Sequence, residues 1–78
     1  MEENFEQAVK RVMSDILNID LDSIDDGTST DNTDSWDSAN HIQLVLALEE
    51  EFSISFDVNE LEAMLSYPDI LHFVQSKL

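Results

Sequence analysis

Hydrophobic residues recur at three- and four-residue spacing in the first part of the chain, at positions 5, 8, 9, 12, 13, 16 and 17. This spacing places their side chains on one face of an α-helix. Acidic residues gather at the start of the segment, where the helix dipole favours negative charge. The pattern predicts an amphipathic helix from about Glu3 to Asn18, with its apolar stripe in the core.

A second helix is predicted from Ser38 to Phe52, and its apolar pattern is broader. The core stripe is expected to hold His41, Leu44, Val45, Leu48 and Phe52. A narrower stripe lies beside it, formed by Ala39, Ile42 and Leu46 and flanked by Glu49 and Glu50. A helix that buries one face does not need a second stripe. The pattern leaves two outcomes open: this stripe packs under a neighbouring element, or it stays exposed for a partner.

A connector and a short helix are predicted next. The segment from Ser53 to Phe56 alternates between polar and apolar residues, and its two apolar side chains, Ile54 and Phe56, are expected to enter the core. Asp57 is a good N-cap residue. It predicts a short helix from Val58 to Leu65, whose inward residues are Leu61, Met64 and Leu65.

The last helix is predicted from about Tyr67 to Lys77. Its start, Ser66-Tyr67-Pro68-Asp69, resembles a capping box with proline in the first turn. The residues expected to be buried are Ile70, Leu71 and either Phe73 or Val74. The sequence thus predicts an all-α fold, a small four-helix bundle of three principal helices and one short helix. Residues 1–78 are expected to form a single domain.

A long loop separates the first two predicted helices, from Asp20 to Asp37. Loops of this length in compact domains tend to be functional or disordered. Leu21 and Ile24 are expected to anchor its first half. After Gly27 the loop contains almost only Ser, Thr, Asp and Asn, which favour turns. The candidates for the N-cap of the second helix are Ser35, Asp37 and Ser38.

Composition narrows the possible partners. The chain has 18 acidic and 3 basic residues and a formal net charge of −15. Few basic side chains are therefore present to neutralise nucleic-acid phosphates, and an anionic membrane would repel the protein. The charge favours a basic partner and salt-sensitive association, although acids also serve simply to keep a small protein in solution. Because neither a signal peptide nor a membrane-span pattern is visible, we expect a soluble, cytoplasmic protein.

Metal sites fit the sequence poorly. An EF-hand register that places Gly27 at its sixth position puts Ile24 at the third and Thr33 at the twelfth, where oxygen ligands are required. A weak, unspecific cation site in the loop remains open. Zinc is disfavoured because the chain has no cysteine and its two histidines, His41 and His72, are far apart in sequence. His41 is expected to be partly buried and hydrogen-bonded.

Ser38 stands at the start of the second helix and has no general base in its sequence neighbourhood. It also lacks the glycine-flanked turn of a hydrolase nucleophile, so no catalytic residue is expected. A helix N-terminus offers free N–H groups and a positive dipole end, which suit a phosphate ester. Position alone leaves two interpretations open: Ser38 is a modification site, or it is an ordinary capping residue.

The run Trp36-Asp37-Ser38-Ala39, continued through Leu48-Glu49-Glu50-Glu51-Phe52, resembles the acyl carrier protein family. The matching features are that family's Asp-Ser-Leu motif and the Leu-Glu-Glu-Glu-Phe end of the following helix. The resemblance implies that Ser38 carries 4′-phosphopantetheine, donated from coenzyme A by a separate phosphopantetheinyl transferase. It implies an acyl or aminoacyl thioester on the arm, and a carrier that acts by tethering while its partners catalyse.

The resemblance also assigns the second stripe of the helix. Ala39, Ile42 and Leu46 would make apolar contacts with partner enzymes. The carboxylates of Asp37, Glu49 and Glu50 would meet basic docking patches on loading and synthase enzymes. The carrier would be a monomer in fatty-acid, polyketide or related specialised biosynthesis.

Three residues depart from the family pattern. Ala39 replaces the leucine after the serine, Ser35 replaces a glycine, and Trp36 precedes Asp37. Trp36 is expected to anchor a loop that lacks the usual apolar residues. The Trp-Asp-Ser form with His41 is similar to specialised carriers of polyketide, aminoacyl or peptide pathways. The alternatives are an unmodified interaction module that binds a basic partner through the second helix, and an acidic cation-binding domain.

Overall fold

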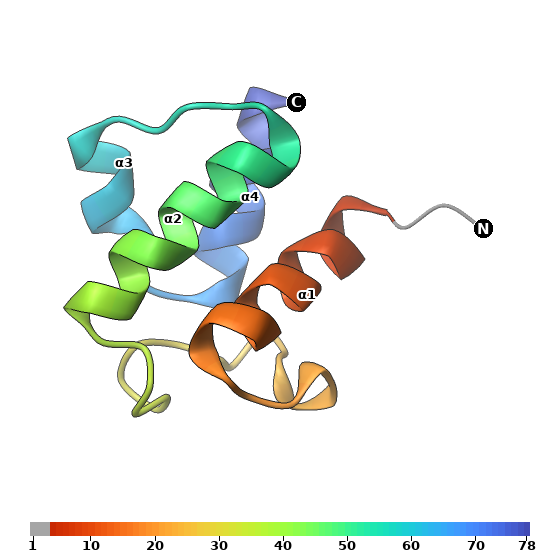
Figure 1. Ribbon diagram of the computed structural model, residues 1–78, viewed down its shortest axis with the longest axis vertical. Helices are drawn as coiled ribbons and strands as arrows, with labels where there is room; N and C mark the ends of the chain where they lie inside the picture. The colour runs from red at the N-terminus through yellow and green to blue at the C-terminus, as the bar shows by residue number, and fades with distance from the viewer. Residues whose placement is uncertain (1–3) are drawn as a thin grey trace.

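The computed structural model describes residues 4–78 and confirms the predicted order of helices (Figure 1). The elements are α1 (Phe5–Leu17), the 3-10 turn η1 (Leu21–Ser23), α2 (Ser38–Phe52), α3 (Val58–Ala63) and α4 (Tyr67–Lys77). The described residues form no β-strand, and extended pairing within them is limited to one isolated bridge between Ser29 and Ser66. The fold is the all-α bundle that the sequence predicts.

Helix α1 is amphipathic as predicted. Asn4 caps it by accepting a hydrogen bond from the Gln7 N–H, and the predicted start at Glu3 lies outside the described residues. The helix ends before Asn18, whose φ of 55° is left-handed. Its buried residues are Ala8, Val9, Val12, Met13 and Leu17. The apolar stripe is therefore core.

Helix α2 has the predicted bounds and packs most closely against α1. Leu44, Val45 and Leu48 are buried, while Phe52 is half-buried against the same core. The helix ends at Phe52. Its C-cap, Ser53, has a φ of 56° and, like Asn18, occupies the left-handed region that normally favours glycine. Its core face therefore holds it against the rest of the bundle, while the opposite side remains available.

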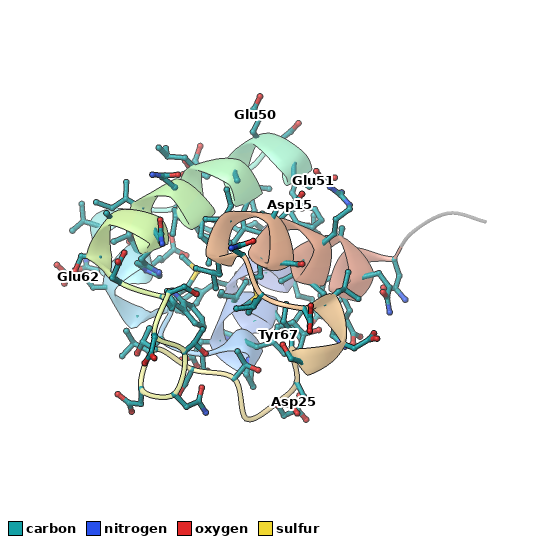
Figure 2. All side chains as sticks on the ribbon, turned by 60° about the horizontal axis from the view of Figure 1, so that its bottom comes forward. Asp15, Asp25, Glu50, Glu51, Glu62 and Tyr67 are labelled. Atoms are coloured by element: carbon teal, nitrogen blue, oxygen red, sulfur yellow. The ribbon has the colours of Figure 1, made fainter. Side chains whose placement is uncertain are left out.

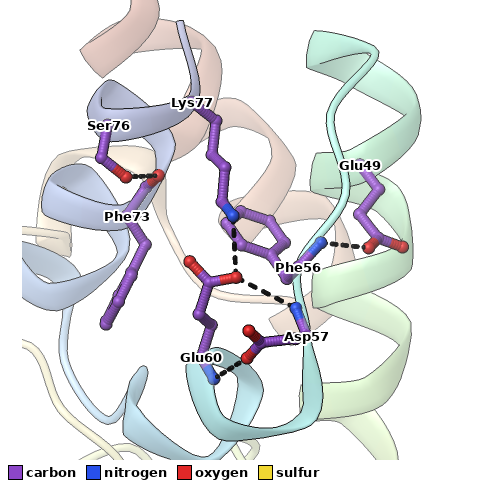
Figure 3. Close-up of polar contacts among 7 residues, drawn as sticks. All are labelled: Glu49, Phe56, Asp57, Glu60, Phe73, Ser76 and Lys77. Atoms are coloured by element: carbon purple, nitrogen blue, oxygen red, sulfur yellow. Dashed lines mark hydrogen bonds and ion pairs between the residues drawn. The ribbon is translucent and has the colours of Figure 1, made fainter.

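Helix α3 begins as predicted but ends two residues early. The Asp57 side chain accepts from the Glu60 N–H, and Glu60 accepts from the Asp57 N–H, which completes a capping box (Figure 3). Met64 is fully buried after the helix end. The prediction that Leu65 points inward is wrong, because its side chain is 52% exposed. Once the chain leaves the helix at Ala63, helical spacing no longer describes Leu65.

Helix α4 has the predicted bounds, with Ser66 as its N-cap and Pro68 in its first turn. Ile70 and Val74 are fully buried, while Leu71 and Phe73 are half-buried. Half of the predicted capping box forms. The Asp69 N–H donates to Ser66 Oγ, but the Asp69 carboxylate accepts from the Leu65 N–H instead of closing the box. The aspartate side chain is one methylene group shorter than that of glutamate, and its carboxylate thus accepts from a different backbone N–H.

The loop between α1 and α2 runs beneath the bundle in Figure 1 and is ordered by its own polar contacts. Ile24 and Trp36 are buried and anchor it, as predicted. The prediction for Leu21 is wrong, since this side chain in η1 is 38% exposed. Backbone bonds from Thr30 to Leu65 and from Tyr67 to Thr28 attach the loop to the start of α4. The loop therefore presents Asp37 and Ser38 from a fixed base.

Candidate functional site: the start of helix α2

Ser38 occupies the first position of α2 and is exposed. Asp37 is the N-cap, and its Oδ1 accepts from the Asn40 N–H at 2.9 Å. Within the described residues the Ser38 hydroxyl has no hydrogen-bond partner. The capping role belongs to Asp37, so the Ser38 hydroxyl is free for another use.

Ser35 offers the nearest alternative hydroxyl, and its surroundings are different. Its side chain is half-buried, and its Oγ is enclosed without a hydrogen-bond partner among the described residues. The Ser35 carbonyl accepts from the Asn40 side chain at 2.8 Å, which holds this residue against the first turn of α2. The Ser38 hydroxyl is therefore the more accessible of the two.

His41 lies one turn after Ser38, but its ring is committed elsewhere. The Trp36 indole N–H donates to His41 Nδ1 at 2.9 Å. His41 Nε2 lies 2.7 Å from the Leu61 carbonyl. The expectation of a partly buried, hydrogen-bonded histidine is confirmed. Since both ring nitrogens are used, His41 does not serve as a general base for Ser38 in this arrangement.

The second stripe of α2 is exposed, which decides between the two outcomes that the sequence left open. Ala39 is exposed, and the side chains of Ile42 and Leu46 are 51% and 59% exposed. Apolar side chains of this size on one face are typical of an interaction surface when polar groups surround them. We call the residues Ala39, Ile42 and Leu46 the outer stripe.

The two glutamates that flank the outer stripe differ. Glu50 is exposed and points away from the bundle in Figure 2. Glu49 is half-buried, and its Oε2 accepts from the Phe56 N–H at 2.8 Å (Figure 3). Glu49 therefore also ties α2 to the connector that leads into α3.

One exposed apolar residue was missed by the sequence reasoning. Val58 is 70% exposed at the first position of α3. The cap at Asp57 was the available signal, because a residue directly after a cap begins the first turn and need not follow the inward stripe. Val58 adds an apolar side chain to the surface of the bundle.

The acidic side chains of the described residues do not form a metal site. Asp25 and Glu62 lie on different parts of the molecule (Figure 2). Asp15, Glu50 and Glu51 line one surface pocket between α1 and α2, where Glu51 forms an ion pair with Arg11. In residues 4–78 no group of three or more histidine, aspartate or glutamate side chains is placed to hold a metal ion. Asp25 in the loop instead accepts from the Gly27 N–H. Nothing in the described residues supports the cation-binding alternative.

None of the helices in residues 4–78 combines the length and the apolar character needed to cross a membrane.

Comparison with known proteins identifies the family. The family model described as "Phosphopantetheine attachment site" matches residues 7–75. The chain belongs to this family. Because the match begins within α1 and ends within α4, it concerns nearly the whole bundle and not the serine motif alone.

Curated relatives carry the name acyl carrier protein. One from Thermosynechococcus vestitus is 29% identical over 92% of this chain and 89% of the relative. One from Buchnera aphidicola subsp. Schizaphis graminum is 30% identical over 95% of this chain and 94% of the relative. One from Sinorhizobium fredii is 28% identical over 88% of each chain. The similarity therefore extends over nearly the full length of this chain and of each relative.

The family supplies the cofactor and the general role. Proteins of this kind carry covalently attached 4′-phosphopantetheine and act as carriers rather than catalysts. The chemistry at the start of α2 fits the group. An exposed primary hydroxyl can form the ester, and the free N–H groups and positive dipole end of a 15-residue helix favour the phosphate.

Proposed function

We propose that Ser38 is the attachment residue and that the protein carries an acyl or aminoacyl group as a thioester on the arm. The observation that supports this most directly is the free, exposed Ser38 hydroxyl at the first position of α2, beside a cap that Asp37 provides. In the attachment step Ser38 Oγ forms a bond to the phosphorus of coenzyme A that bears pantetheine. The bond from that phosphorus to the adenosine bisphosphate breaks, and the latter leaves.

The proton of the Ser38 hydroxyl must go to a base on the phosphopantetheinyl transferase. His41 is the nearest histidine in sequence, but its two nitrogens face Trp36 and Leu61. Asp37 is occupied by the Asn40 N–H at one oxygen and serves the helix start. The carrier thus supplies position and access, while the transferase activates the nucleophile.

We further propose that the outer stripe is the docking surface for partner enzymes. It combines two half-exposed aliphatic side chains, Ile42 and Leu46, with the carboxylates of Asp37, Glu49 and Glu50. A partner with a basic patch around an apolar hollow complements this surface. Steering by the −15 charge should speed association and make it sensitive to salt.

The candidate partners are the transferase, the enzymes that load the arm, and synthases of fatty-acid, polyketide or related specialised biosynthesis. Ala39 and Trp36 favour a specialised carrier. Ala39 presents a smaller apolar contact beside the arm than leucine would. The buried indole of Trp36 anchors the loop.

The attachment proposal is tested by mass spectrometry. The protein is incubated with coenzyme A and a promiscuous transferase, and we expect the mass to rise by one phosphopantetheine. Ser38→Ala should gain nothing, while the control Ser35→Ala should gain one arm like the parent. Absence of any gain in the parent, or an equal gain in Ser38→Ala, would sink the proposal.

A second candidate is an unmodified interaction module of the same fold. The exposed outer stripe favours it, because that surface needs no arm to bind an apolar and basic partner. Isolation from native cells distinguishes the two. A protein found without the arm, whose Ser38→Ala variant binds its partner as tightly as the parent, would favour the module over the carrier.

A further inference from the structure

A hydrogen-bonded bridge joins three segments of the chain next to Ser38. The Trp36 indole N–H donates to His41 Nδ1 at 2.9 Å, and His41 Nε2 lies 2.7 Å from the Leu61 oxygen. The two rings are 6.1 Å apart between centroids and tilted by 35°. Trp36 belongs to the loop, His41 to α2 and Leu61 to α3. We call this arrangement the Trp36–His41–Leu61 bridge.

The bridge is compatible with one form of the imidazole. An indole N–H only donates, so His41 Nδ1 must present its lone pair to Trp36. A carbonyl oxygen only accepts, so His41 Nε2 must carry the proton that Leu61 receives. The two bonds together define the neutral tautomer with the proton on Nε2. The bond to α3 therefore fixes which nitrogen faces the loop.

Trp36 makes the bridge difficult to replace with water. Its side chain is only 3% exposed and forms part of the hydrophobic core. A buried indole N–H without a partner is unfavourable, because no solvent is available to accept its hydrogen bond. His41 is thus the group that allows the indole to be both buried and satisfied.

The bridge acts on the peptide segment that leads into Ser38. The Trp36 N–H donates to the Thr33 oxygen at 2.9 Å, and the Ser35 oxygen accepts from the Asn40 side chain at 2.8 Å. These backbone contacts hold the segment within the loop and the first turn of α2. The contact through His41 also connects this segment to α3. The position of Ser38 is therefore fixed relative to the rest of the bundle.

We infer that His41 is a positioning residue for arm transfer, which through the Trp36–His41–Leu61 bridge keeps the Trp36–Ser38 segment in the geometry that the transferase binds. This inference rests on Ser38 being the attachment residue. His41 does not exchange a proton with the Ser38 hydroxyl. It raises the fraction of carrier molecules that are ready to bind, and a lower ready fraction raises the apparent KM without changing kcat.

Paired substitutions separate the two bonds. His41→Gln keeps an amide N–H that can reach Leu61 but offers Trp36 no acceptor at the position of Nδ1. His41→Asn keeps an oxygen near the position of Nδ1. The control is His72→Asn, because His72 lies exposed on α4 with its ring against Phe73, away from the bridge. All variants are assayed at a temperature at which circular dichroism shows them folded.

The expected result is a split between KM and kcat in transfer from coenzyme A. His41→Gln should raise the KM for the carrier about tenfold at unchanged kcat, and His41→Asn should recover most of that loss. Trp36→Phe should raise KM like His41→Gln, and the double variant should be no worse than either. His72→Asn should match the parent.

Two outcomes overturn the inference. Unchanged KM in His41→Gln would leave the bridge a purely structural contact, and a fall in kcat at unchanged KM would give His41 a chemical role instead. Nitrogen NMR of the imidazole in the unmodified protein gives an independent check, because it needs no arm. It should show the proton on Nε2, and a proton on Nδ1 would contradict the bridge itself. Failure of attachment to Ser38 would be seen separately, as no mass gain in the parent.

Discussion

The two apolar faces of α2 contain similar residues and have opposite surroundings. Leu44 and Leu48 are fully buried, whereas Ile42 and Leu46 are 51% and 59% exposed. Residue type therefore does not separate them, and position around the helix does. The inner face stabilises the bundle through the area it removes from water, while the outer stripe contributes little to folding. The comparison teaches that one helix can stabilise the bundle with one side and leave the other side free for the docking that we propose.

The comparison is tested most strongly by truncating one leucine on each face. Leu48→Ala leaves a cavity in the core and should cost about 2–5 kcal/mol of unfolding free energy. Leu46→Ala should change it by less than about 0.5 kcal/mol, because its side chain is already in water. Urea denaturation followed by circular dichroism measures both. Equal losses would mean that the two faces are not distinct in solution.

Trp36 tests whether the loop belongs energetically to the inner face. Trp36→Phe should cost about 2 kcal/mol, because it removes buried volume and leaves His41 Nδ1 without its donor. Thermal and urea denaturation should agree on this loss. A loss below that of Leu46→Ala would place the loop outside the cooperative core.

The outer stripe is tested by partner binding. The double variant Ile42→Asp/Leu46→Asp should lower kcat/KM with the transferase by about tenfold or more. Its stability should stay within about 1 kcal/mol of the parent, as for surface substitutions. Leu78→Ala is the matched control, because this side chain is 63% exposed outside α2. Equal kinetic effects of the two variants would remove the special role of the stripe.

A charge pair outside both faces should have a smaller effect. The Lys77 ammonium lies 2.8 Å from Glu60 Oε1, and its hydrogen bond, with that of the Asp57 N–H, lowers the pKa of Glu60 (Figure 3). Because the pKa of Glu60 is lower in the folded protein than in the unfolded chain, the ionised carboxylate stabilises the fold at pH values above its ordinary pKa. This contribution is lost as the pH falls through the lowered pKa. The stability difference between the parent and Glu60→Gln should therefore vanish in acid. A difference that grows in acid would contradict the sign.

Tyr67 gives the smallest expected change at neutral pH. Its side chain is buried, and its hydroxyl has no hydrogen-bond partner among the described residues. Tyr67→Phe should therefore leave the stability equal or slightly raised, because an unsatisfied polar group is removed. A loss above about 1 kcal/mol would reveal a partner for the hydroxyl.

The same residue makes an alkaline prediction. Burial raises the pKa of Tyr67 above its ordinary value of 10.0, and the charges of Glu6 and Asp26 add to the rise. The unfolded chain then loses its proton first, so stability is intact below about pH 10 and falls as pH rises through the raised value. In denaturation across this range, Tyr67→Phe should lack that part of the decline.

The sequence predicted what local pattern and capping control. The starts of α2, α3 and α4 follow from Asp37, Asp57 and Ser66, residues that suit helix N-caps. Spacing failed where a helix ended early, at Leu65, or where a loop turned its apolar residue outward, at Leu21. The burial of these side chains depends on packing between distant segments, which the spacing of apolar residues alone does not predict.

At the site, the sequence pattern left open whether the outer stripe is buried or exposed. The structure shows that it is exposed. The bonds of His41 were not predictable, since they require knowing that α3 brings the Leu61 carbonyl to the ring. The family resemblance supplied the arm and its chemistry. The free hydroxyl of Ser38 and the capping by Asp37 are the structural contribution.

The left-handed ends of α1 and α2 have an evolutionary consequence. Asn18 and Ser53 have φ values of 55° and 56°, a conformation that costs residues with a Cβ about 1 kcal/mol relative to glycine. A single mutation to glycine at either position would therefore increase the stability of the fold. Such a reserve of stability lets the surface of a carrier change to suit new enzymes, since a destabilising change there can be offset at a distant helix end.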